Sequence, residues 1–70
     1  MKPHELPPED QEVIRMMADY SLNVSWVARK LFLHRNTVHY RLNRIKESTG
    51  IDPRTFWGLM ELIVRIGGAK

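Results

Sequence analysis

Apolar residues recur along this chain at helical spacing in four blocks, and no block shows the strict alternation typical of a half-buried strand. The blocks are separated by residues that commonly begin or end helices: Pro7 and Pro8, Asn23, Gly50, and Asp52 with Pro53. We therefore predict a small all-α domain of four helices, at about residues 8–20, 24–31, 35–49 and 53–66. A chain of 70 residues without cysteine has room for one thin core and excludes disulfides and Cys-based zinc fingers.

Proline is concentrated ahead of the first predicted helix, with three of the four prolines within residues 1–8. We expect residues 1–7 to form an irregular arm or the remnant of a linker, and residues 8–70 to form the domain. No uninterrupted apolar run exceeds three residues, so we expect no transmembrane helix, no secretory signal and no membrane partner. These expectations place the protein in the cytoplasm.

The excess positive charge of the chain lies in one segment. Residues 21–46 hold six arginines and lysines, two histidines and no acidic residue, whereas residues 1–20 are net acidic. Such a concentration is expected of a surface that faces the phosphates of a nucleic acid. A basic helix face that is merely solvated would have the same composition, so the motif within the segment has to decide between the two interpretations.

Two short helices joined by a tight turn, the second of them basic, predict a helix-turn-helix over about residues 24–48. Ala28 is small enough to let the two helices cross closely, and Leu33 can pack beneath the pair. Many such motifs place glycine at the start of the turn, where this chain has Phe32. We therefore expect the turn to avoid a positive φ at Phe32 or to be wider than usual.

The second helix of the motif is expected to bury Val38 and Leu42 and to offer its first turns to the major groove of DNA. Arginine can bond bidentately to guanine and asparagine to adenine, and histidine can donate to a base or a phosphate. The candidate base-contacting residues are Arg35, Asn36, His39 and Asn43. The candidate phosphate-contacting residues are Ser25, Trp26, His34, Thr37, Tyr40, Arg44 and Lys46.

Other interpretations of these polar residues are structural. We expect Arg41 to tie its helix to the first helix through Asp19 or Glu12, in preference to contacting DNA. His34 and His39 have no third ligand nearby, and no orienting group follows Thr37, so we expect no metal site and no nucleophile. We accordingly expect no enzymatic activity, no cofactor and no small-molecule ligand in this domain.

The last predicted helix is apolar around most of its circumference. We expect Phe56, Leu59, Met60 and Ile63 to form the buried stripe, because a helix with one buried face needs only part of its girth apolar. The residues left over are Trp57, Leu62 and Val64. An exposed apolar strip on so small a domain predicts a partner surface, either for a homodimer or for docking to upstream domains of a larger regulator.

One run of residues resembles a known family. The pattern Ala28, Leu31, His34-Arg35-Asn36-Thr37, Tyr40-Arg41-Leu42, Ile45 and Thr49-Gly50 is similar to the C-terminal helix-turn-helix of PucR/CdaR-type bacterial regulators. The resemblance covers about residues 11–66, whereas Fis-type and NtrC-type motifs share only the Arg-Asn-Thr core. It implies that the chain is the DNA-binding end of a transcriptional regulator, with His34, Arg35, Asn36 and His39 at or near the major groove. Trp26 departs from the family, which often carries a charged or small residue there.

Together these observations predict sequence-specific binding of double-stranded DNA in transcription regulation in a bacterial cytoplasm. Two alternatives stay open. A helical protein-docking or dimerisation module would turn the basic segment toward an acidic partner. A Fis-like architectural binder would contact DNA with little choice of sequence.

Overall fold

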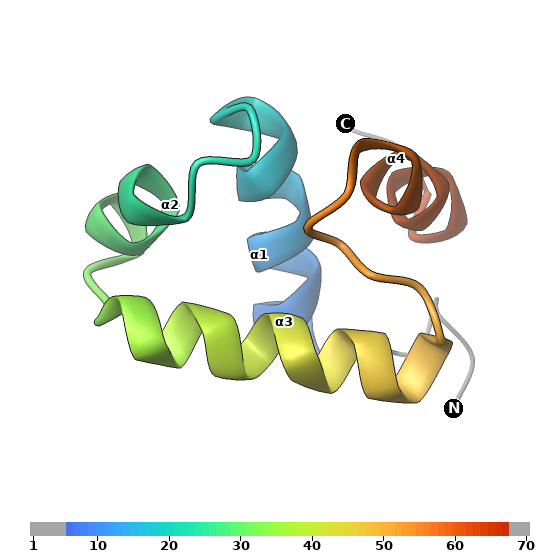
Figure 1. The fold of residues 1–70 in the computed structure, drawn as a ribbon, viewed down its shortest axis with the longest axis horizontal. Coiled ribbons are helices and arrows are strands. Elements are labelled where there is room, and N and C mark those ends of the chain that lie inside the picture. Colours follow the sequence, from blue (N-terminus) through green and yellow to red (C-terminus); the bar gives the residue numbers. More distant parts are fainter. Residues whose placement is uncertain (1–5, 68–70) are drawn as a thin grey trace.

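A computed structural model of the chain describes residues 6–67 and contains four helices (Figure 1). They are α1 (Pro8–Asp19), α2 (Val24–Leu31), α3 (Arg35–Thr49) and α4 (Phe56–Arg65), and the described part of the chain has no strand. The predicted all-α, four-helix fold is therefore confirmed. None of the helices within residues 6–67 combines the length and apolarity that crossing a bilayer requires.

Helix α1 is the centre of the domain, because it packs against each of the other three helices. In Figure 1, α3 runs along one side of the molecule and α2 lies over the first turns of α3. Helix α4 lies on the opposite side of α1 from α2. Every element contributes to one core of aliphatic side chains, consisting of Leu6, Val13, Ile14, Met17, Val27, Ala28, Val38, Leu42, Ile45, Leu59, Leu62 and Ile63. Leu6 belongs to the predicted arm, and residues 1–5 of that arm lie outside the described residues.

Side chains cap three of the helices. The Asn23 side chain accepts a hydrogen bond from the Trp26 N–H at the start of α2 (3.1 Å), and the His34 ring accepts one from the Asn36 N–H at the start of α3 (3.0 Å). At the other end of α3, Gly50 takes the left-handed conformation at φ 76°, where glycine avoids the steric cost of a Cβ. His34 and Gly50 thus cap the two ends of α3, and the predicted roles of Asn23 at the start of α2 and Gly50 at the end of α3 are confirmed.

Helix α4 begins three residues later than predicted. The Asp52 carboxylate accepts the Arg54 N–H (3.0 Å), and this bond closes a turn instead of starting the helix; Thr55 caps α4 by accepting the Gly58 N–H (3.0 Å). The turn lies directly on the helix, since a Cβ at Gly58 would stand 2.2 Å from the Asp52 carbonyl oxygen. Aspartate before proline begins a turn as readily as a helix, and the absence of a side chain at Gly58 lets this turn form.

The buried stripe of α4 is also rotated from the predicted one. Leu59, Leu62 and Ile63 are buried, while Phe56 and Met60 are exposed. The prediction that Phe56 and Met60 line the core is therefore wrong, and so is the placement of Leu62 on a partner surface. Two helical stripes share Leu59 and Ile63, and the structure buries the one completed by aliphatic Leu62. The Phe56 and Met60 side chains remain outside.

The turn between α2 and α3 departs from expectation at Phe32. This residue ends α2 in the left-handed conformation at φ 57° and ψ 43°, and its side chain is 94% exposed. The expectation that the turn avoids a positive φ at Phe32 is wrong. The reason is local, because in this conformation the N–H groups of Phe32 and Leu33 reach the orphan carbonyls of Arg29 (3.2 Å) and Ala28 (2.9 Å).

A partly buried ion pair joins α3 to α1. The Arg44 guanidinium donates two hydrogen bonds to the fully buried Asp10 carboxylate, from Nε (3.0 Å) and Nη2 (2.6 Å), and approaches the exposed Glu9 carboxylate at 3.5 Å. The hydrogen bonds to Asp10 raise the pKa of Arg44 above its ordinary value. The predicted tie between these helices exists, but Arg44 and Asp10 make it. Among residues 6–67, no ion pair joins Arg41 to Asp19 or Glu12.

The left-handed Phe32 gives a first prediction. Replacing Phe32 with glycine removes the Cβ that makes φ 57° costly, and we expect it to raise the free energy of unfolding by about 0.5–1 kcal/mol after the greater chain entropy of glycine is counted. Phe32→Ala is the matched control, because it removes the exposed ring and retains the Cβ. Urea unfolding followed by circular dichroism measures both, and an equal gain for Phe32→Ala would show that the backbone strain is not the cause.

The Asp10–Arg44 pair gives a second prediction. Arg44→Met keeps the apolar stem and leaves the Asp10 carboxylate buried without its partner, so we expect it to lower the free energy of unfolding by about 3 kcal/mol. Glu9→Ala removes only the longer, exposed contact and should cost less than about 0.5 kcal/mol. Thermal and urea unfolding provide the comparison. Equal, small effects of the two substitutions would contradict the structural role of the pair.

Candidate nucleic-acid interface

The pair α2 and α3 has the packing that a helix-turn-helix needs. Ala28 is buried in the core, and α2 packs against α3. Leu33, in the three-residue turn, is half-buried and packs against the core, also as predicted. Val38, Leu42 and Ile45 anchor the inner side of α3. Part of the remaining circumference of α3 is exposed.

The outward side of α3 brings the four predicted base-contacting residues onto one face. Arg35, Asn36 and Asn43 are exposed and His39 is half-buried, and their spacing of three and four residues stacks them along the helix. No acidic residue precedes Glu47 on α3. The face is polar, rich in hydrogen-bond donors and positively charged from its first turn.

The start of α2 lies against the start of α3. Arg35 donates from Nη1 to the Ser25 hydroxyl (3.3 Å), which joins the first turns of the two helices. A shallow polar hollow lies beside Ser25, and its other lining residues are Asn23, Trp26 and Arg29. Ser25, from the predicted phosphate-contacting set, and Arg29, which was not in it, are thus brought together beside the α3 face.

Trp26, the departure from the family pattern, has a structural role. Its ring stacks on Tyr20 with the centroids 6.4 Å apart and the planes 12° apart, and the Arg29 guanidinium lies 5.0 Å from its centroid. Lys30 lies 5.9 Å from the Tyr20 ring centroid. Cations over aromatic faces are attracted by the ring quadrupole, so the Trp26 and Tyr20 rings hold the Arg29 and Lys30 side chains of α2.

The other predicted phosphate-contacting residues have different surroundings. His34 is exposed and caps α3, Thr37 is half-buried in the first turn of α3, and Lys46 is exposed with its Nζ 3.9 Å from an Asp52 carboxylate oxygen. Tyr40 is 63% exposed, and the Arg44 guanidinium lies 5.6 Å from its ring centroid. Arg44 is thus held between the Tyr40 ring and the acidic groups of α1.

Sequence reasoning missed Arg54, which reaches the α3 face from the turn before α4. Its guanidinium donates from Nη2 to the Asn43 side-chain oxygen (2.6 Å) and lies 3.5 Å, through Nη1, from Nδ1 of the His39 ring. Its Nε donates to the Asp52 carboxylate (3.2 Å). The local sequence does not predict these contacts, because they depend on how the turn before α4 folds back along α3.

Asp52 holds Arg54 in place by two bonds. Its Oδ1 accepts from both the Arg54 N–H and the Arg54 Nε. The backbone hydrogen bond is the main reason why the pKa of Asp52 lies below its usual value, with the Arg54 side chain adding to it and burial opposing it. The carboxylate is therefore ionised at neutral pH and fixes the arginine beside α3.

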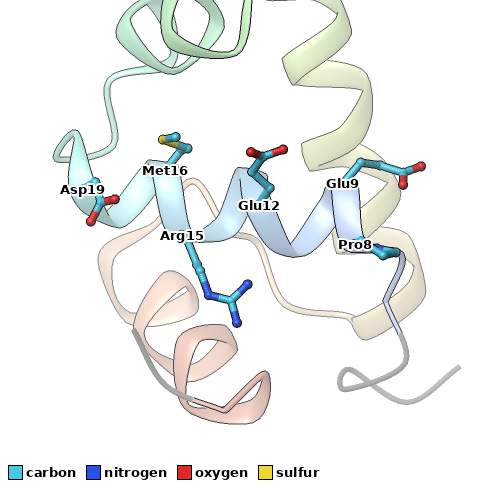
Figure 2. A pocket seen from close by; sticks show the side chains of 6 residues that line it. All are labelled: Pro8, Glu9, Glu12, Arg15, Met16 and Asp19. Atoms are coloured by element: carbon cyan, nitrogen blue, oxygen red, sulfur yellow. The ribbon is translucent and has the colours of Figure 1, made fainter. Parts of the chain in front are cut away.

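The outer side of α1 differs in charge. Pro8, Glu9, Glu12, Arg15, Met16 and Asp19 line an open hollow (Figure 2). Within residues 6–67, the residues that line it all belong to α1. Its carboxylates would repel phosphate. No group of three or more potential metal ligands converges within residues 6–67.

The exposed side of α4 carries an apolar strip next to the ion pair of Glu61 and Arg65. Trp57 is 79% exposed and Val64 is 70% exposed, as predicted for both, while Leu62 is buried. Phe56 and Met60 take its place on the outside, and the Phe56 and Trp57 rings meet edge to face with centroids 5.0 Å apart. We call Phe56, Trp57, Met60 and Val64 the α4 strip.

The packing of α2 against α3 and the polar, basic face of α3 together are those of a helix-turn-helix domain. The family model of the PucR C-terminal helix-turn-helix domain matches residues 11–66, and the chain belongs to this family. The resemblance seen in the sequence is confirmed. This is a family of DNA-binding domains of transcription regulators, and it is not an enzyme family.

Several proteins share parts of the sequence. Uncharacterized protein YxkF of Bacillus subtilis is 35% identical over 52 residues, which cover 74% of this chain and 18% of YxkF. The Carbohydrate diacid regulator of Escherichia coli is 59% identical over 29 residues, or 41% of this chain and 8% of that protein. Uncharacterized protein Rv2242 of Mycobacterium tuberculosis is 69% identical over 26 residues, or 37% of this chain and 6% of Rv2242.

The chain thus spans less than a fifth of the length of each of these relatives. No solved structure matches it.

Proposed function

We propose that this domain binds double-stranded DNA in a sequence-specific manner, with α3 in the major groove and α2 positioning it across the backbone. The observation that carries the proposal is the single polar face of α3, on which Arg35, Asn36, His39 and Asn43 lie together. Arginine and asparagine have the hydrogen-bonding groups that match guanine and adenine edges. We therefore assign base contacts to these four residues.

Phosphate contacts are proposed around this face. The set is Ser25, Trp26, His34, Thr37, Tyr40, Arg44 and Lys46, to which we add Arg29 because it lies beside Ser25 at the start of α2. Arg44 contributes least in this proposal, since Asp10 already balances its charge. The acid-free segment 21–46 supplies the positive potential that draws the domain to DNA.

The test is a salt titration of the chain on a labelled random-sequence duplex, read by fluorescence anisotropy, followed by selection of a preferred site. We expect log K to fall steeply against log[salt]. On the selected site, Arg35→Ala should cost about 1–3 kcal/mol of binding free energy and relax the choice at one base position. Arg65→Ala is the control, because it removes the same charge from α4, where Arg65 pairs with Glu61.

Two results would contradict the proposal in different ways. A folded domain that does not bind at low salt would favour the protein-docking alternative, in which the basic segment faces an acidic partner. Binding that is equally strong on all sequences, with Arg35→Ala and Arg65→Ala indistinguishable, would favour an architectural binder with little choice of sequence.

We further propose that the α4 strip joins two copies of the chain. Exposed Trp57 and Val64 leave apolar area on a very small domain, and two copies could address half-sites about one helical turn apart.

Trp57→Ala should leave the fold intact, because the side chain is outside the core, and should weaken self-association in sedimentation equilibrium at least tenfold. Val13→Ala, in the core, is a control that destabilises the fold. A wild-type chain that stays monomeric at high concentration would contradict this proposal. It would favour docking of the α4 strip to the rest of a larger regulator.

A further inference from the structure

We propose that Arg54 sets the base preference of α3, by making Asn43 and His39 act as hydrogen-bond donors so that the position they face prefers guanine to adenine. This inference rests on the proposed function, because it requires α3 to read base edges. It assigns a specificity-determining role to a residue outside the helix-turn-helix itself. Arg54 lies in the turn between α3 and α4 and reaches back across eleven residues to Asn43.

The first step concerns the orientation of Asn43. A guanidinium has five N–H donors and no acceptor, so the 2.6 Å contact with Arg54 requires the Asn43 oxygen, and not its NH₂ group, to face the arginine. The two N–H donors of the amide are then the groups left for a ligand. Asn43 is exposed, so its amide can reach a base edge.

The same reasoning fixes the tautomer of His39. Arg54 can only donate, so the ring nitrogen that faces it, Nδ1, is the acceptor in this 3.5 Å contact. The proton of the neutral ring then lies on Nε2, which becomes a donor. One arginine thus gives two neighbouring side chains of the α3 face the same hydrogen-bonding polarity.

The third step converts this polarity into a base preference. Asparagine recognises adenine by accepting from N6 and donating to N7, which requires its oxygen. Here Arg54 engages that oxygen and places a positive charge beside it. A cation there disfavours the amino group of adenine and favours the O6 and N7 acceptors of guanine. The expectation from the sequence alone, that Asn43 would suit adenine, is replaced by guanine.

Arg54 is held firmly enough for this role. Its side chain is 28% exposed, and Asp52 binds both its backbone N–H and its Nε. Gly58 lets the turn lie on the first turn of α4, since any Cβ there would meet the Asp52 carbonyl at 2.2 Å. The arginine is therefore positioned by a packed turn before any DNA arrives, and its fork does not have to be ordered on binding.

The experiment is binding-site selection from a randomised duplex pool with four proteins: wild type, Asn43→Ala, Arg54→Met and Arg65→Met. Asn43→Ala identifies the base position that depends on Asn43. At that position the wild type should enrich guanine over adenine by about fivefold or more, and Arg54→Met should lose or reverse this ratio. Arg65→Met loses the same charge away from α3 and should leave the ratio unchanged. Circular dichroism confirms that each variant is folded.

The outcomes separate the inference from the proposed function. A wild type that does not bind DNA at low salt overturns both. Sequence-specific binding in which the Asn43-dependent position prefers adenine, is unaffected by Arg54→Met, or does not exist overturns the inference alone. If Arg54→Met does not fold, the comparison of wild type with Asn43→Ala still decides, because the inference requires Asn43→Ala to abolish a preference for guanine.

Discussion

A buried carboxylate determines how the basic helix sits in this domain. Asp10 is inaccessible to solvent, and such a charge is costly unless it is paired and hydrogen-bonded. Arg44 supplies both bonds from the third turn of α3, so the rotation of α3 about its own axis is fixed. With Arg44 turned toward α1 and Leu42 toward the core, Asn43 is left on the outside. The pairing and the buried residues Val38, Leu42 and Ile45 together determine which side of α3 is exposed.

The outward face is assembled from more than the helix-turn-helix. At the first turn of α3, Arg35 is hydrogen-bonded to Ser25 of α2. At the third turn of α3, Asn43 is hydrogen-bonded to Arg54 of the turn between α3 and α4. Both attachments are made by arginine, whose planar fork can hold two partners in defined directions. The family model matches residues 11–66, so the matched segment includes this turn.

The sequence predicts the four helices well, because spacing and capping residues are local signals. It does not predict the start of α4 or the side of α4 that is buried, because the sequence signals there are ambiguous. Asp52 before proline suits a turn and a helix start equally, and an all-round apolar α4 allows two overlapping stripes, of which the structure buries the one with Leu62. The base-contacting set of α3 remains a prediction, although its residues share one face. Arg54 could not be foreseen, since its contacts depend on tertiary structure.

The turn between α2 and α3 is specified by a dihedral angle and not by a residue type. Phe32 adopts φ 57°, a conformation that glycine adopts more easily, with its ring in solvent. A consensus search that demands glycine at this position would discard the chain, although its helices pack as the motif requires. Weighting the crossing alanine and the turn leucine, at Ala28 and Leu33, would recover members whose turns are strained.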